Sequence, residues 1–503
     1  MKDKAALLFA ALLVAGLLFP RVFGPSPLGA QSPLDVETSE PVHLDPAVAV
    51  QQLVRTRLES DFAAIQAFRP GYGFWEHIFT IPDGSVAYGS AVDGRLIAVF
   101  PSNGDWSRDA AWEEPELAVA LAGTRLASNL TRRRDEVVSL LDPVTGPLVH
   151  NPTRGAFVSP NVARYGSFLA EWGAIYERFG VPAEIGLAQA MIESGFNPTV
   201  RSEARAIGFC QWLDRNWNEL KRLSPTVIEA HNQTTQAAYC AAYLTILTAK
   251  YGSFIPALSE HHAGGTNVGR ALINGDRLGG QDVREQYFIG AAFALDLREI
   301  STDRYREVVR TYGPRSFRYT EMVFGNAGRI LGLTDSIAQD SIFAIRAGRN
   351  IPIEEVVRRT GLTTDEVRRF NPALLRQVPA GANLYLPFPM DELGRDVTFW
   401  HGAPSPEFAA VLEDLFRLGA PVALWDDSAF ERILRDLQTR FRETGTEEGG
   451  VMATMLAFVM NETYRSGRGA QLDEFRTSTR ILRLFEEGVA ERANVRAAAT
   501  LAR

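Results

Sequence analysis

The sequence has little lysine, few cysteines and no long apolar run. Its densest basic cluster, Arg132-Arg133-Arg134, is followed at once by Asp135 and Glu136, and the 503-residue chain carries a net charge of −8. Such a chain lacks the basic surface that binds nucleic acid, so we expect no nucleic acid partner. Its longest apolar stretches are too short to span about 30 Å of bilayer hydrocarbon comfortably.

The N-terminus has the pattern of an export signal. Lys2 and Lys4 precede an apolar run from Ala5 to Phe19, and Leu28-Gly29-Ala30 offers a cleavage site. We interpret residues 1–30 as a signal peptide, with a retained inner-membrane anchor as the alternative. No cysteine follows the run, so a lipoprotein is not expected. The predicted location is the periplasm or cell envelope, and membrane association through the N-terminus stays open.

Composition and length predict several domains. Apolar residues make up 46% of the chain, which is enough for a sizeable core, and the length indicates roughly three domains. Residues 31–50 are proline-rich and polar, as in a linker. Residues 51–153 mix helix with short strands, expected at His77–Ile81, Ser85–Tyr88 and Arg95–Phe100. No motif there indicates a role.

One acidic residue stands at the end of an apolar helix. Ile185, Ala188 and Ile192 repeat at helical spacing, and Glu193 falls beside them on the last turn, just before Gly195. Partial burial at this position would raise the pKa of the Glu193 carboxyl and suit it to act as a general acid. A solvated glutamate at a frayed helix end is the alternative.

The motifs that follow Glu193 favour the general acid over the solvated glutamate. The run from Glu193 to Pro198 reads Glu-Ser-Gly-Phe-Asn-Pro, and Ser202 and Gly208-Phe209-Cys210-Gln211 follow at short intervals. This order resembles the lysozyme-like lytic transglycosylases, whose signature begins Glu-Ser-Xaa-Phe-Asn-Pro and continues through a serine to Gly-Leu-Met-Gln. The resemblance implies a helical catalytic domain, which we place at residues 154–333.

Two further family elements are less well kept. The family's Ala-Ala-Tyr-Asn-Ala-Gly corresponds to Ser259–Gly264, where His261 and His262 replace the tyrosine and the asparagine. A tyrosine on the next helix corresponds to Tyr287. The resemblance makes Glu193 and Tyr287 the catalytic residues, with Tyr287 holding Glu193 or the sugar. A core tyrosine with a satisfied hydroxyl is an equal alternative for Tyr287. It also implies a set of residues that bind substrate along the cleft: Ser194, Ser202, Gln211, His261 and His262.

The adjacent histidines also raise the question of a metal. Neighbours in sequence point in different directions on a helix, and no His-Glu-Xaa-Xaa-His spacing is present. We therefore predict no metal site and no cofactor.

The two cysteines, Cys210 and Cys240, both lie in the suspected catalytic segment. In an oxidising compartment they would form a disulfide that contributes about 3 kcal/mol. Two buried free thiols are an equal alternative. A cysteine-protease reading with His261 or His262 has no third orienting residue and is weaker.

Residues 341–389 are predicted to form a small βααβ domain. The helices are expected at Pro352–Arg359 and Thr364–Phe370, between strands near Ser341–Arg346 and Leu384–Pro387. This order resembles a LysM module, a fold that binds N-acetylglucosamine-containing glycans, although the usual Gly-Asp-Thr-Leu opening is absent. A purely structural domain is the alternative.

Residues 404–503 are predicted to form an amphipathic helical bundle in which Gly450–Met460 is a buried helix. The fold class expected is therefore mainly α. It combines a lysozyme-like catalytic domain, a mixed α/β N-terminal region, the LysM-like domain and the C-terminal bundle.

The reaction that the resemblance implies needs a single carboxyl group. A lytic transglycosylase cleaves the MurNAc-GlcNAc bond of peptidoglycan glycan strands with one acid and forms a 1,6-anhydro sugar. A hydrolytic muramidase would need a second carboxylate, for which Glu203 and Glu260 are the first candidates and Asp214 and Glu285 further ones. A catalytically weak, peptidoglycan-binding scaffold is the other alternative.

Overall fold

The computed structural model describes residues 45–101, 103–300, 318–397, 403–418 and 427–466. Residues 1–44, which include the predicted signal peptide and most of the predicted linker, lie outside the described residues. No helix within the described residues is long and apolar enough to cross a membrane. The described chain is mainly helical, as the sequence predicts.

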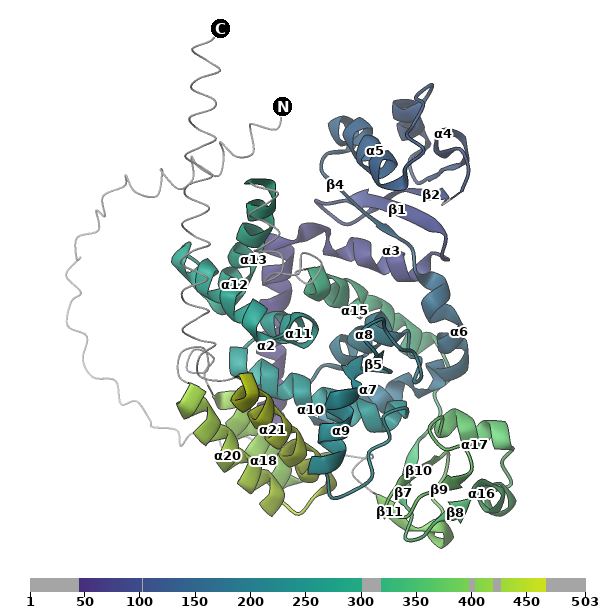
Figure 1. Cartoon of the computed structure of the whole chain (residues 1–503), viewed down its shortest axis with the longest axis vertical. Helices are drawn as coiled ribbons and strands as arrows, with labels where there is room; N and C mark the ends of the chain where they lie inside the picture. The colour runs from purple at the N-terminus through teal and green to yellow at the C-terminus, as the bar shows by residue number, and fades with distance from the viewer. Residues whose placement is uncertain (1–44, 102, 301–317, 398–402, 419–426, 467–503) are drawn as a thin grey trace, which may run out of the picture. The chain divides into compact units, whose positions relative to one another are not determined.

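A cluster of buried helices forms the centre of the catalytic segment. Helix α8 packs against α7 and α15, and α10 packs against α7 and α11 (Figure 1). Nearly every residue of α8 and α10 is buried, which explains why both sequences are apolar around most of the helix. The helices of this segment are α6 (Gly155–Tyr165), α7 (Leu169–Arg178), α8 (Ala183–Ser194), α9 (Asp214–Leu223), α10 (Gln233–Tyr251), α11 (Phe254–Ala263), α12 (Gly265–Arg277), α13 (Val283–Ile300) and α15 (Tyr319–Ser336).

The first described helix, α2 (Pro46–Phe68), belongs to the same body and corrects the predicted linker boundary at residue 50. Asp45 caps it by accepting hydrogen bonds from the backbone of the first turn, and Pro46 occupies the first helical position. The buried Asp61 carboxylate accepts hydrogen bonds from Ser253 Oγ at 2.7 Å and from Arg284 Nε at 2.5 Å. Helix α2 is therefore anchored to the start of α11 and to α13.

Helix α2 also contacts a helix that is distant in sequence. It packs along α18 (Pro406–Arg417). The Arg57 guanidinium hydrogen-bonds the Phe416 carbonyl, 359 residues away in sequence, and lies 4.9 Å from the centre of the Phe416 ring.

The N-terminal mixed region contains a four-stranded sheet with strand order β3-β2-β1-β4. Strands β1 (Ser85–Ser90) and β2 (Leu96–Pro101) agree with the prediction, and β3 (Ala111–Trp112) and β4 (Leu148–Pro152) complete the sheet. The other elements are α4 (Trp106–Asp109), the 3-10 helices η1 (Pro70–Gly73) and η2 (Pro115–Leu121), and α5 (Leu130–Thr145), which packs on η2 and β4.

The strand predicted at His77–Ile81 is wrong, because this segment belongs to helix α3 (Phe74–Thr80). Phe74, Trp75, Ile78 and Phe79 are all buried, which is a helical spacing rather than an alternation. The short length of the segment hid its period.

Residues 341–389 have the predicted order of elements. Strand β7 (Phe343–Arg346) is followed by β8 (Ile351–Pro352), α16 (Ile353–Thr360), α17 (Thr364–Phe370), β9 (Gln377–Val378) and β10 (Asn383–Leu386). The sheet has the order β10-β7-β11, so it also uses β11 (Arg395–Val397), which lies beyond the predicted boundary at residue 389. The second edge of β7 needs a hydrogen-bonding partner, and β11 provides it. The resemblance to LysM stays a prediction.

Three described helices follow, namely α18, α20 (Asp427–Glu443) and α21 (Glu447–Ser466). The central part of α21 is buried, as predicted for Gly450–Met460, and α21 packs on α9 and α10. The Arg178 guanidinium on α7 and the Glu448 carboxylate on α21 form an ion pair at 3.5 Å, with both side chains at most 5% exposed. The Phe458 ring stacks on Trp212, 6.0 Å between centroids. These contacts join the C-terminal helices to the catalytic segment.

Candidate active site

Glu193 lies one residue before the end of α8, at a chain reversal that only a few residue types can form. Gly195 follows in the left-handed conformation, with φ +57°, and its amide donates to the Met191 carbonyl. A Cβ at Gly195 would collide with the Phe157 carbonyl. The glycine therefore lets the chain leave α8 sharply, which positions Glu193 at the helix end with a side chain that is 12% exposed.

The next residue, Phe196, is also left-handed, with φ +63°. This conformation is unfavourable for a residue with a Cβ, by about 1–3 kcal/mol. Burial offsets the cost, because the Phe196 ring is fully buried and packs near Trp172 and Phe209, with centroid separations of 6.3 and 6.1 Å. The aromatic cluster therefore holds the turn that follows Glu193.

Two histidines from α11 meet Glu193. The Nδ1 atoms of His261 and His262 each lie 3.7 Å from Glu193 Oε1. The His261 side chain is 5% exposed, whereas that of His262 is 38% exposed. The residues that replace the family's Tyr-Asn pair thus face the candidate acid directly, and only His262 is open to solvent.

A tyrosine that sequence reasoning missed completes the cluster. Tyr319, the first residue of α15, lies with its ring parallel to that of His262 at a centroid distance of 4.4 Å and an angle of 4°. Its buried hydroxyl faces Glu193 and Gln189 without completing a hydrogen bond of ordinary geometry to any described residue. Such long contacts are common in active sites without substrate and tighten when substrate binds.

The structure corrects the expected electrostatics of Glu193. Burial opposes ionisation, but interactions with His262, His261 and the Tyr319 hydroxyl outweigh it and lower the pKa of Glu193 below its ordinary value. Burial lowers the pKa of His261, although Glu193 acts in the opposite direction. Burial and the facing carboxyl keep the pKa of Tyr319 well above that of an ordinary tyrosine, so its hydroxyl stays a donor. The resting carboxyl is therefore ionised, because these interactions outweigh its burial.

Tyr287, predicted to hold Glu193 or the reacting sugar, contacts residues of α11 and α15. It is fully buried on α13, and its hydroxyl hydrogen-bonds Ser259 Oγ at 3.0 Å and interacts with Thr320. Burial raises the pKa of Tyr287 to about 12. Because Ser259 is on α11 and Thr320 is on α15, Tyr287 braces the two helices that carry His262 and Tyr319.

The remaining predicted cleft residues hydrogen-bond mainly to backbone groups. Ser194 is fully buried and its hydroxyl donates to the Ala190 carbonyl at 2.8 Å, so it serves α8 rather than a substrate. Ser202 Oγ accepts from the Ala206 amide at 3.0 Å. Gln211, left-handed at φ +50°, donates from Nε2 to the Gly208 carbonyl at 3.1 Å. Ser202 and Gln211 therefore fix the loop after α8, which includes the short pair β5 (Ala206–Ile207) and β6 (Trp212–Leu213).

The cysteines are joined. Cys210 and Cys240 form a disulfide, with their Cα atoms 6.1 Å apart, within the usual range. The bridge ties the loop after α8 to the middle of α10. His261 also interacts with the Cys210 backbone, so the disulfide supports one side of the cluster around Glu193.

Three of the four candidate second carboxylates are already engaged. Glu260 Oε2 lies 2.8 Å from Lys250 Nζ and also accepts from the Tyr251 hydroxyl. Asp214 pairs with Arg201 at 3.1 Å. Glu285 accepts the Gln281 amide at 2.8 Å. Glu203 is exposed in the loop after α8.

Residues 171–282 match the family model of the transglycosylase SLT domain. The chain carries an SLT domain. Glu193, both histidines and the disulfide all lie inside the matched span, whereas Tyr287 and Tyr319 lie beyond it. The SLT domain indicates a lytic transglycosylase-type enzyme that acts on peptidoglycan. No curated protein matches the chain significantly.

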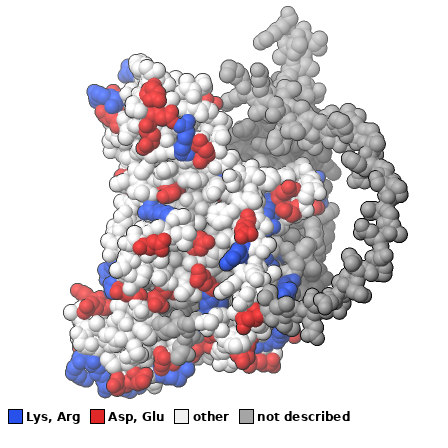
Figure 2. All heavy atoms as spheres, turned by 180° about the vertical axis from the view of Figure 1, so that it is seen from behind, with Lys and Arg blue, Asp and Glu red and all other residues white. Residues whose placement is uncertain are grey.

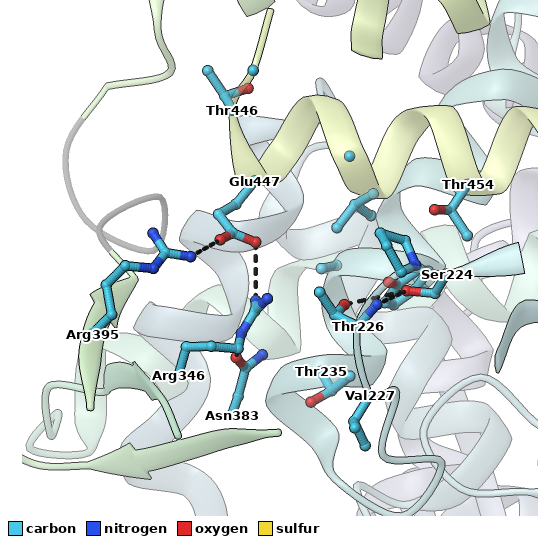
Figure 3. A pocket seen from close by; sticks show the side chains of 16 residues that line it. Ser224, Thr226, Val227, Thr235, Arg346, Asn383, Arg395, Thr446, Glu447 and Thr454 are labelled. Atoms are coloured by element: carbon cyan, nitrogen blue, oxygen red, sulfur yellow. Dashed lines mark hydrogen bonds and ion pairs between the residues drawn. The ribbon is translucent and has the colours of Figure 1, made fainter. Parts of the chain in front are cut away.

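A hollow lies where the SLT domain, the βααβ domain and α21 meet (Figure 3). It has a volume of about 340 Å³ and is lined by segments of all three. Glu447 bridges two arginines across it, at 2.9 Å from Arg346 and 2.6 Å from Arg395.

Acidic and basic side chains are interspersed on the face of the molecule shown in Figure 2.

Beneath this hollow, Glu229 of the SLT domain is buried. It accepts hydrogen bonds from Thr235 Oγ1 at 2.9 Å and from the Asn383 amide at 3.2 Å. Burial raises the pKa of Glu229 to about 6. The network therefore couples the SLT domain to strand β10 through a carboxyl that titrates in a physiological range.

Proposed function

We propose that the protein is a lytic transglycosylase that cleaves the β-1,4 bond between MurNAc and GlcNAc and leaves a 1,6-anhydro-MurNAc end. One observation carries this proposal. Glu193 stands at the centre of a polar cluster inside the SLT domain, while three other candidate carboxylates have partners of their own. A reaction that needs one carboxyl group fits this arrangement better than one that needs two.

The proposed reaction uses Glu193 twice. Glu193 first donates a proton to the glycosidic oxygen, so that the bond to the muramic C1 breaks while the substrate's own acetamido oxygen supports the positive charge. The carboxylate then accepts the proton of the C6 hydroxyl while the oxygen of that hydroxyl bonds to C1. No water is consumed, and the enzyme ends with the proton that it lost. Tyr319 and the two histidines orient the carboxyl through both steps.

The other predicted parts of the chain fit the same substrate. Peptidoglycan lies outside the cytoplasm, so we propose that residues 1–30 direct export to the periplasm or cell envelope, with or without a retained anchor. We propose further that residues 341–389 bind the glycan strand as a LysM-like module. Both proposals rest on the sequence patterns alone.

Mass spectrometry of digested peptidoglycan tests the function. Wild type should release anhydro-muropeptides, whereas Glu193→Gln should release none, because glutamine cannot donate the proton. Glu203→Gln is the matched control and should behave as wild type. Reducing-end products from wild type would show hydrolysis, that is, a muramidase. Strand binding without any release would favour the scaffold alternative.

A further inference from the structure

The geometry around Glu193 leaves the source of the first proton open. Protonation of the glycosidic oxygen requires a neutral carboxyl, yet His261, His262 and Tyr319 all present donors to this one and keep it ionised at rest. The proton must therefore be stored close by. This inference rests on the proposed function, since the stored proton is the one that the transglycosylase reaction uses.

We propose that His262 holds this proton at Nδ1, passes it to Glu193 Oε1 when a glycan strand fills the cleft, and takes it back at the end of each turnover. The two atoms lie 3.7 Å apart, slightly beyond hydrogen-bonding distance. A shift of less than 1 Å brings them to hydrogen-bonding distance, and contacts of this kind tighten on substrate binding.

Exposure distinguishes His262 from its neighbour. His262 is 38% exposed, so it can exchange a proton with solvent, whereas His261 is 5% exposed and its burial disfavours the charged form. His261 is therefore less able than His262 to take up a proton from solvent. The aromatic stack with Tyr319, at 4.4 Å and 4°, fixes the plane of the His262 ring, and Nδ1 lies on the Glu193 side of it.

Other charged or titratable groups around the two imidazoles do not compete for this task. Tyr243 of α10 presents its ring to His261 at 6.0 Å, and the hydroxyl of Tyr319 on α15 stays protonated. Glu260, next to His261 on α11, is paired with Lys250. Among these groups His262 and Glu193 form the pair that can share one proton.

Desolvation supplies the physical reason for the transfer. In the resting state that we propose, the proton lies on His262 and Glu193 is a carboxylate, and water solvates this pair from the exposed side of His262. A glycan strand lying over His262 removes that water, which penalises two charges more than two neutral groups. The proton then moves from nitrogen to oxygen, leaving neutral His262 and a protonated Glu193. After Glu193 has donated this proton and recovered another from the C6 hydroxyl, the proton returns to His262 as the product leaves.

The test is the pH dependence of anhydro-muropeptide release by wild type and by His262→Asn, which restores the family's residue. An ordinary imidazole titrates about two pH units above a carboxyl, and a coupled pair titrates as a unit. Loss of His262 should move the basic limb of the rate profile to lower pH by about one unit or more. The rate at pH 7 should fall about tenfold or more, and the rate at the acidic optimum should stay within a few-fold.

A residue that only lowers the pKa of Glu193 by its charge would give the opposite shift. Its removal would move the basic limb to higher pH. An unchanged limb, or one that moves to higher pH, would therefore overturn the proposal. His150→Asn, on the distant strand β4, is the matched control and should leave the profile unchanged.

Chemical rescue provides a second measurement. His262→Gly opens a solvent-facing space, and imidazole added to the assay at pH 7 should restore part of the rate in proportion to its concentration. The absence of rescue in a variant with the wild-type circular dichroism spectrum would count against proton storage. The identity of the products distinguishes a failure of the proposed function from a failure of the role proposed for His262. Reducing-end products from wild type would refute the proposed function, whereas anhydro products with an unshifted profile would refute only the role of His262.

Discussion

Replacement of Tyr319 by phenylalanine isolates one hydroxyl of the candidate active site. The substitution keeps the ring that stacks on His262 at 4.4 Å and removes only the oxygen that faces Glu193. A hydrogen bond to a charged acceptor contributes about 1.5–3 kcal/mol. Each 1.36 kcal/mol changes a rate tenfold, so we expect kcat to fall about 10- to 150-fold. KM should change little, because the contact is long in the free enzyme and tightens only during the reaction.

Stability should respond in the opposite sense. The Tyr319 hydroxyl is buried without an ordinary hydrogen bond to any described residue, and such a group costs free energy in the folded state. The Tyr319→Phe variant should therefore unfold at the same temperature as wild type or slightly above it. Initial rates of anhydro-muropeptide release and thermal unfolding by circular dichroism measure the two effects.

Tyr287→Phe is the control for this experiment. Its hydroxyl bonds Ser259 at 3.0 Å and interacts with Thr320, so its loss should cost about 1 kcal/mol of stability and lower kcat less than Tyr319→Phe does. The reasoning is refuted if Tyr319→Phe retains full activity, or if Tyr287→Phe loses as much activity as Tyr319→Phe does.

Three further predictions concern stability. Because burial raises the folded-state pKa of Glu229 to about 6, the stability it contributes is present below the unfolded-state pKa and is lost as the pH rises through about 6. Urea unfolding should show about 2 kcal/mol of this loss between pH 4.5 and 7, absent in Glu229→Gln. Arg178→Met leaves the buried Glu448 carboxylate unpaired and should lower the free energy of unfolding by about 3–5 kcal/mol. Replacement of Cys210 and Cys240 by serine opens a 30-residue loop and should cost about 3–4 kcal/mol.

Each of these has a clear contrary result. Equal pH dependence in wild type and Glu229→Gln would show that another group titrates. Arg132→Met breaks an exposed ion pair with Glu136 and should change stability by less than about 1 kcal/mol; a loss as large as that of Arg178→Met would contradict the burial argument. Unchanged unfolding of wild type under reducing conditions would contradict the third prediction.

The sequence predicts the parts of this fold that depend on local pattern. The helix that bears Glu193, the sharp exit at Gly195 and the helices of the βααβ domain follow from apolar spacing and from glycine and proline positions. The segment at His77–Ile81 is the exception, because five residues cannot show whether their period is that of a helix or a strand.

The parts that were missed depend on contacts between distant segments. Tyr319 lies 126 positions after Glu193 (319 − 193) and outside the span that matches the family model. Its one local signal was its place at the head of an apolar helix, where Val323 and Ala327 repeat on the buried side. Likewise, the lowered pKa of Glu193 arises from side chains on α11 and α15, which helix position alone does not reveal.

The contact between α2 and α18 has a consequence for how the enzyme is made. Arg57 and Phe416 lie 359 positions apart in sequence, so the part of α2 that packs on α18 stays uncovered until most of the described chain has been synthesised. Contacts between residues so far apart form late and slowly. A growing chain that stops early therefore carries the Glu193 segment without the helices that close its body. The order of synthesis therefore means that the SLT segment is made well before the helix that completes the packing of α2.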